Sequence, residues 1–356
     1  MRSFGPLPVL LGLVLLNAVG WYGPLAASDV SSAQRAAAEK TLRALDLELL
    51  GEIWITQRER RLRAHLSRVE KSHRRYRKVE QRLDELLKAN ETNGAKLLIG
   101  KQQLAQLKKA KPKGNATQLQ QHKARVQQVE KIVAVLRRRY VPSQRLAEAA
   151  PARHRAGELA EARTALMLLL ATIRDHVGRL EDDYRPLRKD AAVRSALQTL
   201  GAERLGSMRD FDRELRRVAE LEGLLNKAPL PFYRQSGRLR IGVLVNHRTP
   251  ATFTLLESGG ETLIPSSLVQ AAAIDIPDDA PRVIYRTKRR KLETRRVTIA
   301  YLRIGSAELR EVTALALPPE GEDLGAQLAP SALSGYRMKL DSRRLRLHLE
   351  PIDEER

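Results

Sequence analysis

The sequence predicts a protein of two parts, a long α-helical coiled-coil or hairpin region followed by a small all-β domain. Apolar residues recur at alternating spacings of three and four over residues 31–227, as they do along coiled-coil helices. From residue 238 onward, short apolar runs are separated by turn residues, which is typical of strands. Aromatic residues make up 4% of the chain, and this scarcity suits an elongated helical rod better than a globular enzyme core.

The composition excludes several classes of site. The chain has 356 residues and no cysteine, so it can form two or three domains but no thiolate metal site, cysteine nucleophile or disulfide. Its seven histidines show no HExxH or other close metal-ligand spacing, and no glycine-rich phosphate loop or Ser-His-Asp arrangement occurs. We therefore expect neither a metal nor a cofactor.

The positive charge is concentrated in the helical part. The net charge is +22, and residues 238–356 hold 19 basic and 16 acidic residues, which leaves +19 for the residues before them. Such a field favours an anionic partner, such as nucleic acid, an acidic lipid surface or a polyanionic envelope polymer, without choosing among them. Charge runs on coiled coils also commonly serve as solvated faces.

Residues 1–27 are expected to be a signal peptide or an N-terminal anchor. A positive start precedes the apolar run Leu7–Trp21, which at about 15 residues is short for a membrane span and suits a signal peptide. Leu25–Ala27 offers a cleavage site, whereas Trp21 and Tyr22 could hold an uncleaved anchor at a membrane interface. Both alternatives predict export to the periplasm or cell envelope, which makes nucleic acid an unlikely partner.

Residues 31–227 are predicted to form a basic helical coiled-coil region. Three apolar stripes at three-four spacing predict its packed faces. The first comprises Leu62, Leu66, Val69, His73, Tyr76, Val79, Leu83 and Leu86; the second Leu119, His122, Val126, Val129, Val133, Leu136 and Tyr140; and the third Leu159, Ala162, Leu166, Leu169, Ile173, His176 and Leu180.

Breaks between these helices predict antiparallel hairpins. They are expected at Asn90–Gly94, at residues 111–115, at Val141–Ser143, around Pro186 and at Gly201–Gly206. After the last break, Ser207 and Asp210 have the spacing of a helix N-terminus, and an apolar stripe continues to Leu225.

Residues 228–237 contain two prolines and are expected to form a linker to a β domain spanning 238–356. The domain is predicted to contain a short helix at Ser266–Ala273. Its strands are predicted at Leu239–Val245, Ala251–Leu256, Arg282–Tyr285, Arg295–Arg303, Leu309–Leu317, Tyr336–Leu340 and Arg343–Leu349.

The stretch Thr254–Pro265 is the most informative part of this domain. An apolar run enters a Gly-Gly turn with one carboxylate, Glu257, at its mouth, and a second apolar run leaves it. Gly259 and Gly260 permit positive φ, so the chain can reverse sharply and hold the side chains of Glu257 and Ser258 at the bend. A carboxylate in that position suggests chemistry or binding.

The order of these elements resembles that of the retropepsin-like aspartic proteases. Glu257, Ser258 and Gly259 stand where that family has Asp-Thr-Gly, and the supporting motif of two apolar residues and a glycine falls on Leu328 and Ala329. The resemblance implies a β barrel over about residues 238–351. The family's flap hairpin would fall on Thr287, Lys288, Arg289 and Arg290.

The same resemblance implies a homodimer in which two carboxylates share a proton and activate a water molecule. Glu257 is longer than aspartate by one methylene, and misplacement on that scale can cost about 10²-fold in rate. Ala329 also replaces the glycine of the supporting motif. We therefore expect an exported scaffold or binding module for a peptide or protein, a degenerate pseudoenzyme. The alternative is an active envelope aspartic-type endopeptidase, whose basic flap would favour acidic substrates.

Overall fold

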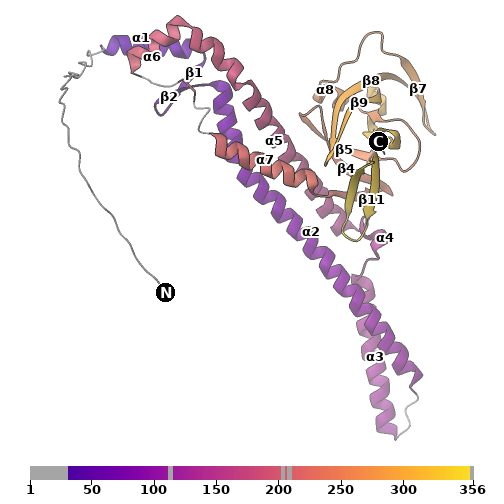
Figure 1. The fold of residues 1–356 in the computed structure, drawn as a ribbon. Helices are drawn as coiled ribbons and strands as arrows, with labels where there is room; N and C mark the ends of the chain where they lie inside the picture. The colour runs from indigo at the N-terminus through magenta and orange to yellow at the C-terminus, as the bar shows by residue number, and fades with distance from the viewer. Residues whose placement is uncertain (1–30, 111–114, 202–204, 207–210, 353–356) are drawn as a thin grey trace, which may run out of the picture.

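The computed structural model describes residues 31–110, 115–201, 205–206 and 211–352. The expected signal segment at 1–27 and the expected helix start at Ser207 and Asp210 lie outside these ranges. A long helical arm carries a sheet-rich C-terminal domain near its middle (Figure 1). The helices are α1 (Ser32–Ala44), α2 (Gln57–Lys109), α3 (Ala116–Arg139), α4 (Ser143–Leu146), α5 (Ala150–Lys189), α6 (Ala191–Leu200), α7 (Asp212–Lys227) and α8 (Ser266–Ala271).

The arm is built on α2, a helix of 53 residues. Both α3 and α5 pack along it (Figure 1), so the predicted antiparallel hairpins are confirmed. The predicted stripe on α2 is buried at Leu62, Val69, Tyr76 and Leu83, and the stripe on α5 is buried over most of its length. The stripe on α3 is less covered, with Val133 buried and Leu119 exposed. Among the described helices, none is long and apolar enough to cross a membrane.

The predicted break at Asn90–Gly94 is wrong, because α2 continues through it. The side chain of Asn90 makes two hydrogen bonds with the backbone of Val141, of 2.9 and 2.8 Å. Gly94 leaves room for the ring of Tyr140, since a Cβ there would lie 2.6 Å from a ring carbon. The turn-forming residues therefore make tertiary contacts within a helix. The break expected around Pro186 falls at Asp190, whose side chain caps α6.

A short hairpin before α2 was not expected from the sequence. Strands β1 (Leu47–Leu50) and β2 (Ile53–Thr56) pair antiparallel around Gly51, which has a φ of +62°. Trp54 of β2 is buried in a small core with residues of α1 and α6. The apolar spacing of this leucine-rich run fits a helix as well as a strand, so the sequence predicts helix here, and that prediction is wrong.

The C-terminal domain contains a ten-stranded sheet in the order β11-β12-β3-β4-β5-β10-β6-β9-β8-β7, with β4 also pairing with β8. Its first strand, β3, occupies Leu230–Gln235, so the expected linker at 228–237 is largely part of the sheet. The other strands are β4 (Arg238–Val245), β5 (Thr249–Leu255), β6 (Leu263–Ile264), β7 (Arg282–Arg286), β8 (Lys291–Ile304), β9 (Ala307–Ala316), β10 (Gln327–Leu328), β11 (Tyr336–Asp341) and β12 (Arg346–Pro351).

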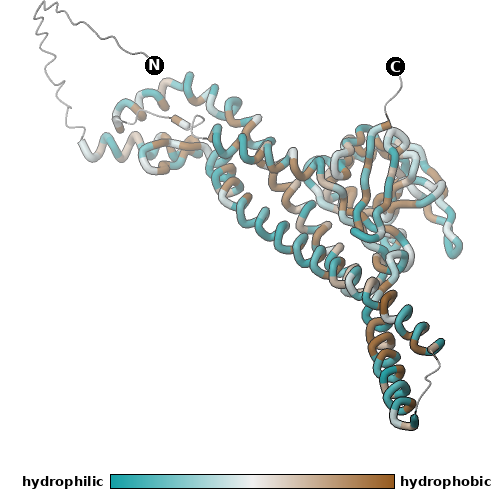
Figure 2. The backbone as a smooth tube through the Cα atoms, turned by 60° about the horizontal axis from the view of Figure 1, so that its bottom comes forward, coloured by the Kyte–Doolittle hydropathy of each residue, from teal (hydrophilic) through white to brown (hydrophobic). Residues whose placement is uncertain are grey.

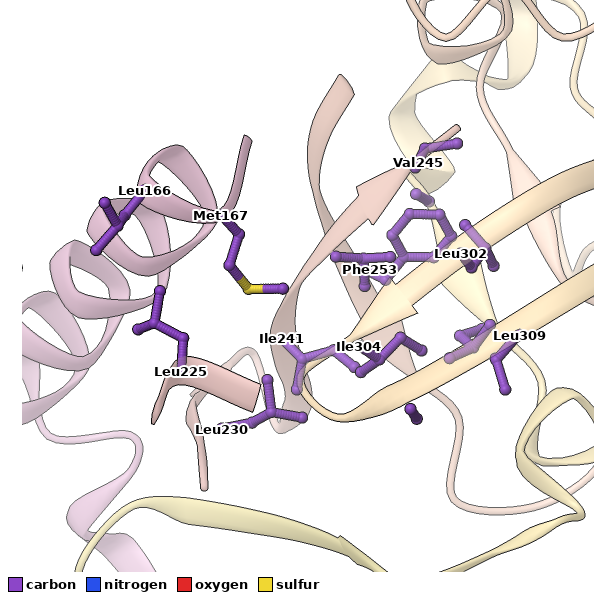
Figure 3. Close-up of a cluster of buried hydrophobic side chains, with 14 of the residues drawn as sticks. Leu166, Met167, Leu225, Leu230, Ile241, Val245, Phe253, Leu302, Ile304 and Leu309 are labelled. Carbon is purple, nitrogen blue, oxygen red and sulfur yellow. The ribbon is translucent and has the colours of Figure 1, made fainter. Parts of the chain in front are cut away.

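The arm and the sheet share one apolar core. Met167 of α5 reaches toward Ile241 of β4 (Figure 3). Gly242 allows this approach, because a Cβ there would lie 2.5 Å from the hydroxyl of Thr164. Helix and sheet therefore pack directly against each other, without an intervening linker.

Two buried arginines reinforce the junction. Arg163 donates hydrogen bonds to the backbone carbonyls of Leu225, in the last turn of α7, and of Ala228 and Pro229, which follow that helix. Burial lowers the pKa of Arg163 to about 10, so its guanidinium remains charged at neutral pH. Arg303 of β8, 3% exposed, donates to Glu222 of α7 at 2.8 Å. Both α7 and the sheet are thus fixed by charge-assisted hydrogen bonds.

Candidate functional site

The turn that carries Glu257 is supported by β10. This strand lies between the strands that enter and leave the turn, parallel to β5 and antiparallel to β6. The Leu256 amide donates to the Leu328 carbonyl at 3.0 Å, and the Ala329 amide donates to the Thr262 hydroxyl at 3.2 Å. Leu328 and Ala329 are buried. The structure therefore brings the two motifs singled out in the sequence together.

The two glycines adopt the backbone that the sequence suggests. Gly259 has a φ of +55° and Gly260 a φ of +85°, a region that favours glycine. A Cβ at Gly260 would also lie 2.8 Å from a side-chain carbon of Leu256, whereas Gly259 faces open space. The turn therefore has a specific need for glycine at position 260. Glu257 and Ser258 are both exposed at its mouth.

The Glu257 carboxylate is held by an arginine that sequence reasoning missed. Arg234 of β3 donates from Nη2 to Oε1 of Glu257 at 3.0 Å, and from Nη1 to the Gly237 carbonyl at 2.7 Å. The Glu257 side chain is 70% exposed, and that of Arg234 is 26% exposed. Arg234 lies within the segment expected to be a linker. The Ser236-Gly237 turn before an alternating strand was the signal that could have placed it in a hairpin.

The expected flap residues form a tight turn between β7 and β8. The Thr287 amide donates to the Arg290 carbonyl at 2.9 Å, and the Thr287 hydroxyl accepts from the amides of Arg289 and Arg290. Lys288 and Arg289 are exposed. Both views place β7 on the side of the domain away from the arm (Figures 1 and 2). The hairpin thus presents two basic side chains to solvent.

A short helix, η2 (Pro319–Leu324), connects this hairpin to the segment behind the turn. Asp323 forms an ion pair with Arg290 of the hairpin. Glu322 accepts hydrogen bonds from the Ser266 hydroxyl and from the amide and hydroxyl of Ser267, and the Ser266 hydrogen bond is the main cause that lowers the pKa of Glu322. Since η2 leads into β10, it braces the hairpin, α8 and the strand that supports the Glu257 turn. The sequence analysis did not identify this role.

The described residues contain no group of three or more His, Cys, Asp or Glu side chains suited to a metal ion. The chemistry available at the turn is therefore that of one exposed carboxylate, its arginine partner and nearby backbone groups. This set can bind a charged or extended ligand. It would need a second carboxylate from another source for aspartic-protease chemistry.

Comparison with known proteins gives a weak similarity to solved structures. No protein-family model and no curated protein matches the chain. A retropepsin-like aspartic protease from Rickettsia conorii has a similar solved structure, with 15% sequence identity and a TM-score of 0.27. The match covers 32% of this chain and 84% of that protein. Because the TM-score is this low, the function is inferred from the geometry of the Glu257 turn and its neighbours.

Proposed function

We propose that this protein is an exported scaffold of the cell envelope whose C-terminal domain is a degenerate retropepsin-like barrel that binds a peptide or protein. The observation that carries the proposal is the Arg234–Glu257 ion pair. In an aspartic peptidase, a water molecule lies between two carboxylates and is activated by them. Here the Arg234 guanidinium donates a hydrogen bond to Oε1 of Glu257, one of the oxygens on which that water would depend.

The retropepsin-like assignment is supported by topology. The acidic turn between β5 and β6 is backed by β10, and a hairpin follows at the position of the expected flap. Exposed Lys288 and Arg289 on this hairpin favour a partner with acidic residues. The excess positive charge of the arm also suits an anionic envelope polymer or lipid surface.

Peptide capture provides the first test. The full chain is screened against an immobilised peptide library with acidic and neutral members, and hits are compared with Lys288→Ala/Arg289→Ala and with the exposed control pair Arg343→Ala/Arg344→Ala. Loss of binding to acidic peptides in the first pair alone is the expected result. Equal loss of binding in both pairs would mean that binding depends only on net charge. Cell fractionation that finds the protein in the cytoplasm would exclude the envelope role.

The second candidate is a homodimeric aspartic-type endopeptidase that uses Glu257. It is favoured by the sharp glycine turn, which presents a carboxylate at the expected position. Cleavage of casein is measured from about pH 3 to 7, the range in which a shared-proton carboxylate pair should work, with Glu257→Gln as control. Cleavage that disappears in Glu257→Gln and increases in Arg234→Ala would establish the peptidase and refute the binding-only role. Sedimentation at several concentrations tests the homodimer.

A further inference from the structure

A second polar site lies at the far end of β5 from Glu257. The turn between β4 and β5 meets α5 there and borders an open hollow of about 590 Å³. Since β5 has seven residues, the hollow lies about 20 Å along the strand from the Glu257 turn. The side chains that line it include Arg174, His247, Arg248, Tyr301, Glu308 and Arg310.

The turn is held in an unusual conformation. Asn246 and His247 have φ values of +46° and +57°, although neither is glycine. A non-glycine residue in this region costs on the order of 1 kcal/mol and persists only where the surroundings fix it. Here the Asn246 side chain accepts from the Tyr301 amide at 3.1 Å and donates to the Ala272 carbonyl at 3.1 Å. The surroundings therefore fix the turn against β8 and the end of α8.

This conformation places an imidazole beside basic side chains. The His247 ring stacks on Tyr301 with centroids 3.5 Å apart and an interplanar angle of 22°. Arg310 lies directly opposite Tyr301 in the β8–β9 register, so both side chains leave the same face of the sheet. Burial is the main cause that lowers the pKa of His247, and Arg303, Arg174 and Arg310 lower it further against an opposing effect of Glu308.

The charges around the hollow do not cancel. Arg174 and Arg303 share Glu222, and Glu308 lies 3.8 Å from Arg303. Arg248 and Arg310 form no ion pair with any residue that the structure describes. These four arginines and two glutamates leave a net charge of +2 at one location.

We propose that this hollow binds a phosphate group, as the dianion of a phosphate monoester. Arginine side chains match the geometry of phosphate oxygens and bind them through paired charge-assisted hydrogen bonds. Arg248 and Arg310, which form no ion pair with a described residue, balance the two negative charges of a dianion. Arg174, 63% exposed, retains hydrogen-bond donors that its ion pair with Glu222 does not use. The fixed turn orients His247 toward the same ligand without an ordering cost on binding.

The test is calorimetric titration of the full chain with glycerol 3-phosphate at low ionic strength, with chloride at matched ionic strength as a blank. Each charge-assisted arginine–phosphate contact is expected to contribute roughly tenfold in Kd. Arg248→Ala and Arg310→Ala should therefore each weaken binding about tenfold, and the double variant about a hundredfold. A parallel arm uses vesicles containing phosphatidic acid, which present the same chemical group on a lipid.

The matched control is Arg343→Ala/Arg344→Ala, which removes the same charge from the exposed turn before β12. This control should retain binding, and the His247 imidazole resonance should shift on saturation while that of His348 does not. Binding of the soluble ester identifies a soluble ligand, and variant-sensitive binding of vesicles alone identifies a lipid headgroup. The proposal would be overturned by equal Kd values for the wild type and Arg248→Ala/Arg310→Ala, or by an equal loss of binding in the control. It would also be overturned if neither glycerol 3-phosphate nor the vesicles bind at about 10 mM ligand.

Discussion

Replacing Gly242 with alanine should weaken the junction between α5 and β4. The added Cβ would lie 2.5 Å from the Thr164 hydroxyl and 3.3 Å from the Ala160 carbonyl oxygen. Carbon–oxygen contacts normally begin near 3.3 Å, so the helix must retreat by about 0.8 Å. Overpacking of this kind costs about 1–3 kcal/mol, whereas the loss of glycine flexibility in the unfolded chain returns about 0.4–1 kcal/mol. The free energy of unfolding should therefore fall by about 1–2 kcal/mol.

Urea denaturation followed by circular dichroism measures this loss, which should lower the midpoint by about 0.5 M. Gly178→Ala on α5 is the matched control, because a Cβ there meets no atom within 4 Å, and it should be neutral or stabilising. Thr164→Ala removes the hydroxyl and should make the Gly242→Ala change about 1 kcal/mol less costly in a double-mutant cycle. An unchanged midpoint for Gly242→Ala, or a cycle without coupling, would show that α5 does not approach β4 this closely.

Three further changes test other parts of the structure. Glu222→Gln should destabilise the fold by roughly 3 kcal/mol in urea denaturation, because it removes the closest carboxylate to the buried charge of Arg303, at 2.8 Å, and leaves only Glu308 at 3.8 Å; a loss below about 1 kcal/mol would contradict this. Gly260→Ala should disrupt the acidic turn and increase its hydrogen exchange, whereas Gly223→Ala, in open space on α7, should not. The folded-state pKa of Glu322 is lowered, so its stabilising effect is complete above the usual value of 4.5 and is lost as the pH falls through the folded pKa. Acid should therefore increase the hydrogen exchange of α8, and Glu322→Gln should remove that pH dependence.

The sequence was most informative where a local pattern has one structural solution. A strand, two glycines and a second strand predicted the turn at Glu257 because positive φ at Gly259 and Gly260 allows little else. The helical stripe around Leu83 was equally readable, since its three-four spacing runs uninterrupted and is buried as expected.

The sequence was least informative where a distant partner decides the outcome. Asn90 has the local preference of a turn, but its bonds to Val141 keep it in a helix. The proline-containing segment before Arg234 lacks the appearance of a strand, yet it pairs with β4 on one side and β12 on the other. The ion pair of Glu257 depends on that pairing, so the closest electrostatic neighbour of the candidate site could not be inferred from local pattern.

The position of β12 has a consequence for the order in which the chain assembles during translation. Residues 346 and 347 pair with residues 231 and 230 of β3, and Arg346 also lies 3.7 Å from carboxylates of Glu80 and Asp84 on α2. When the helical arm has emerged from the ribosome, β12, which pairs with β3 and contacts α2 through Arg346, has not yet emerged. The arm can therefore form early, and the β3–β4 pairing that positions Arg234 can follow, whereas the edge of the sheet at residues 230 and 231 is completed only when β12 joins it.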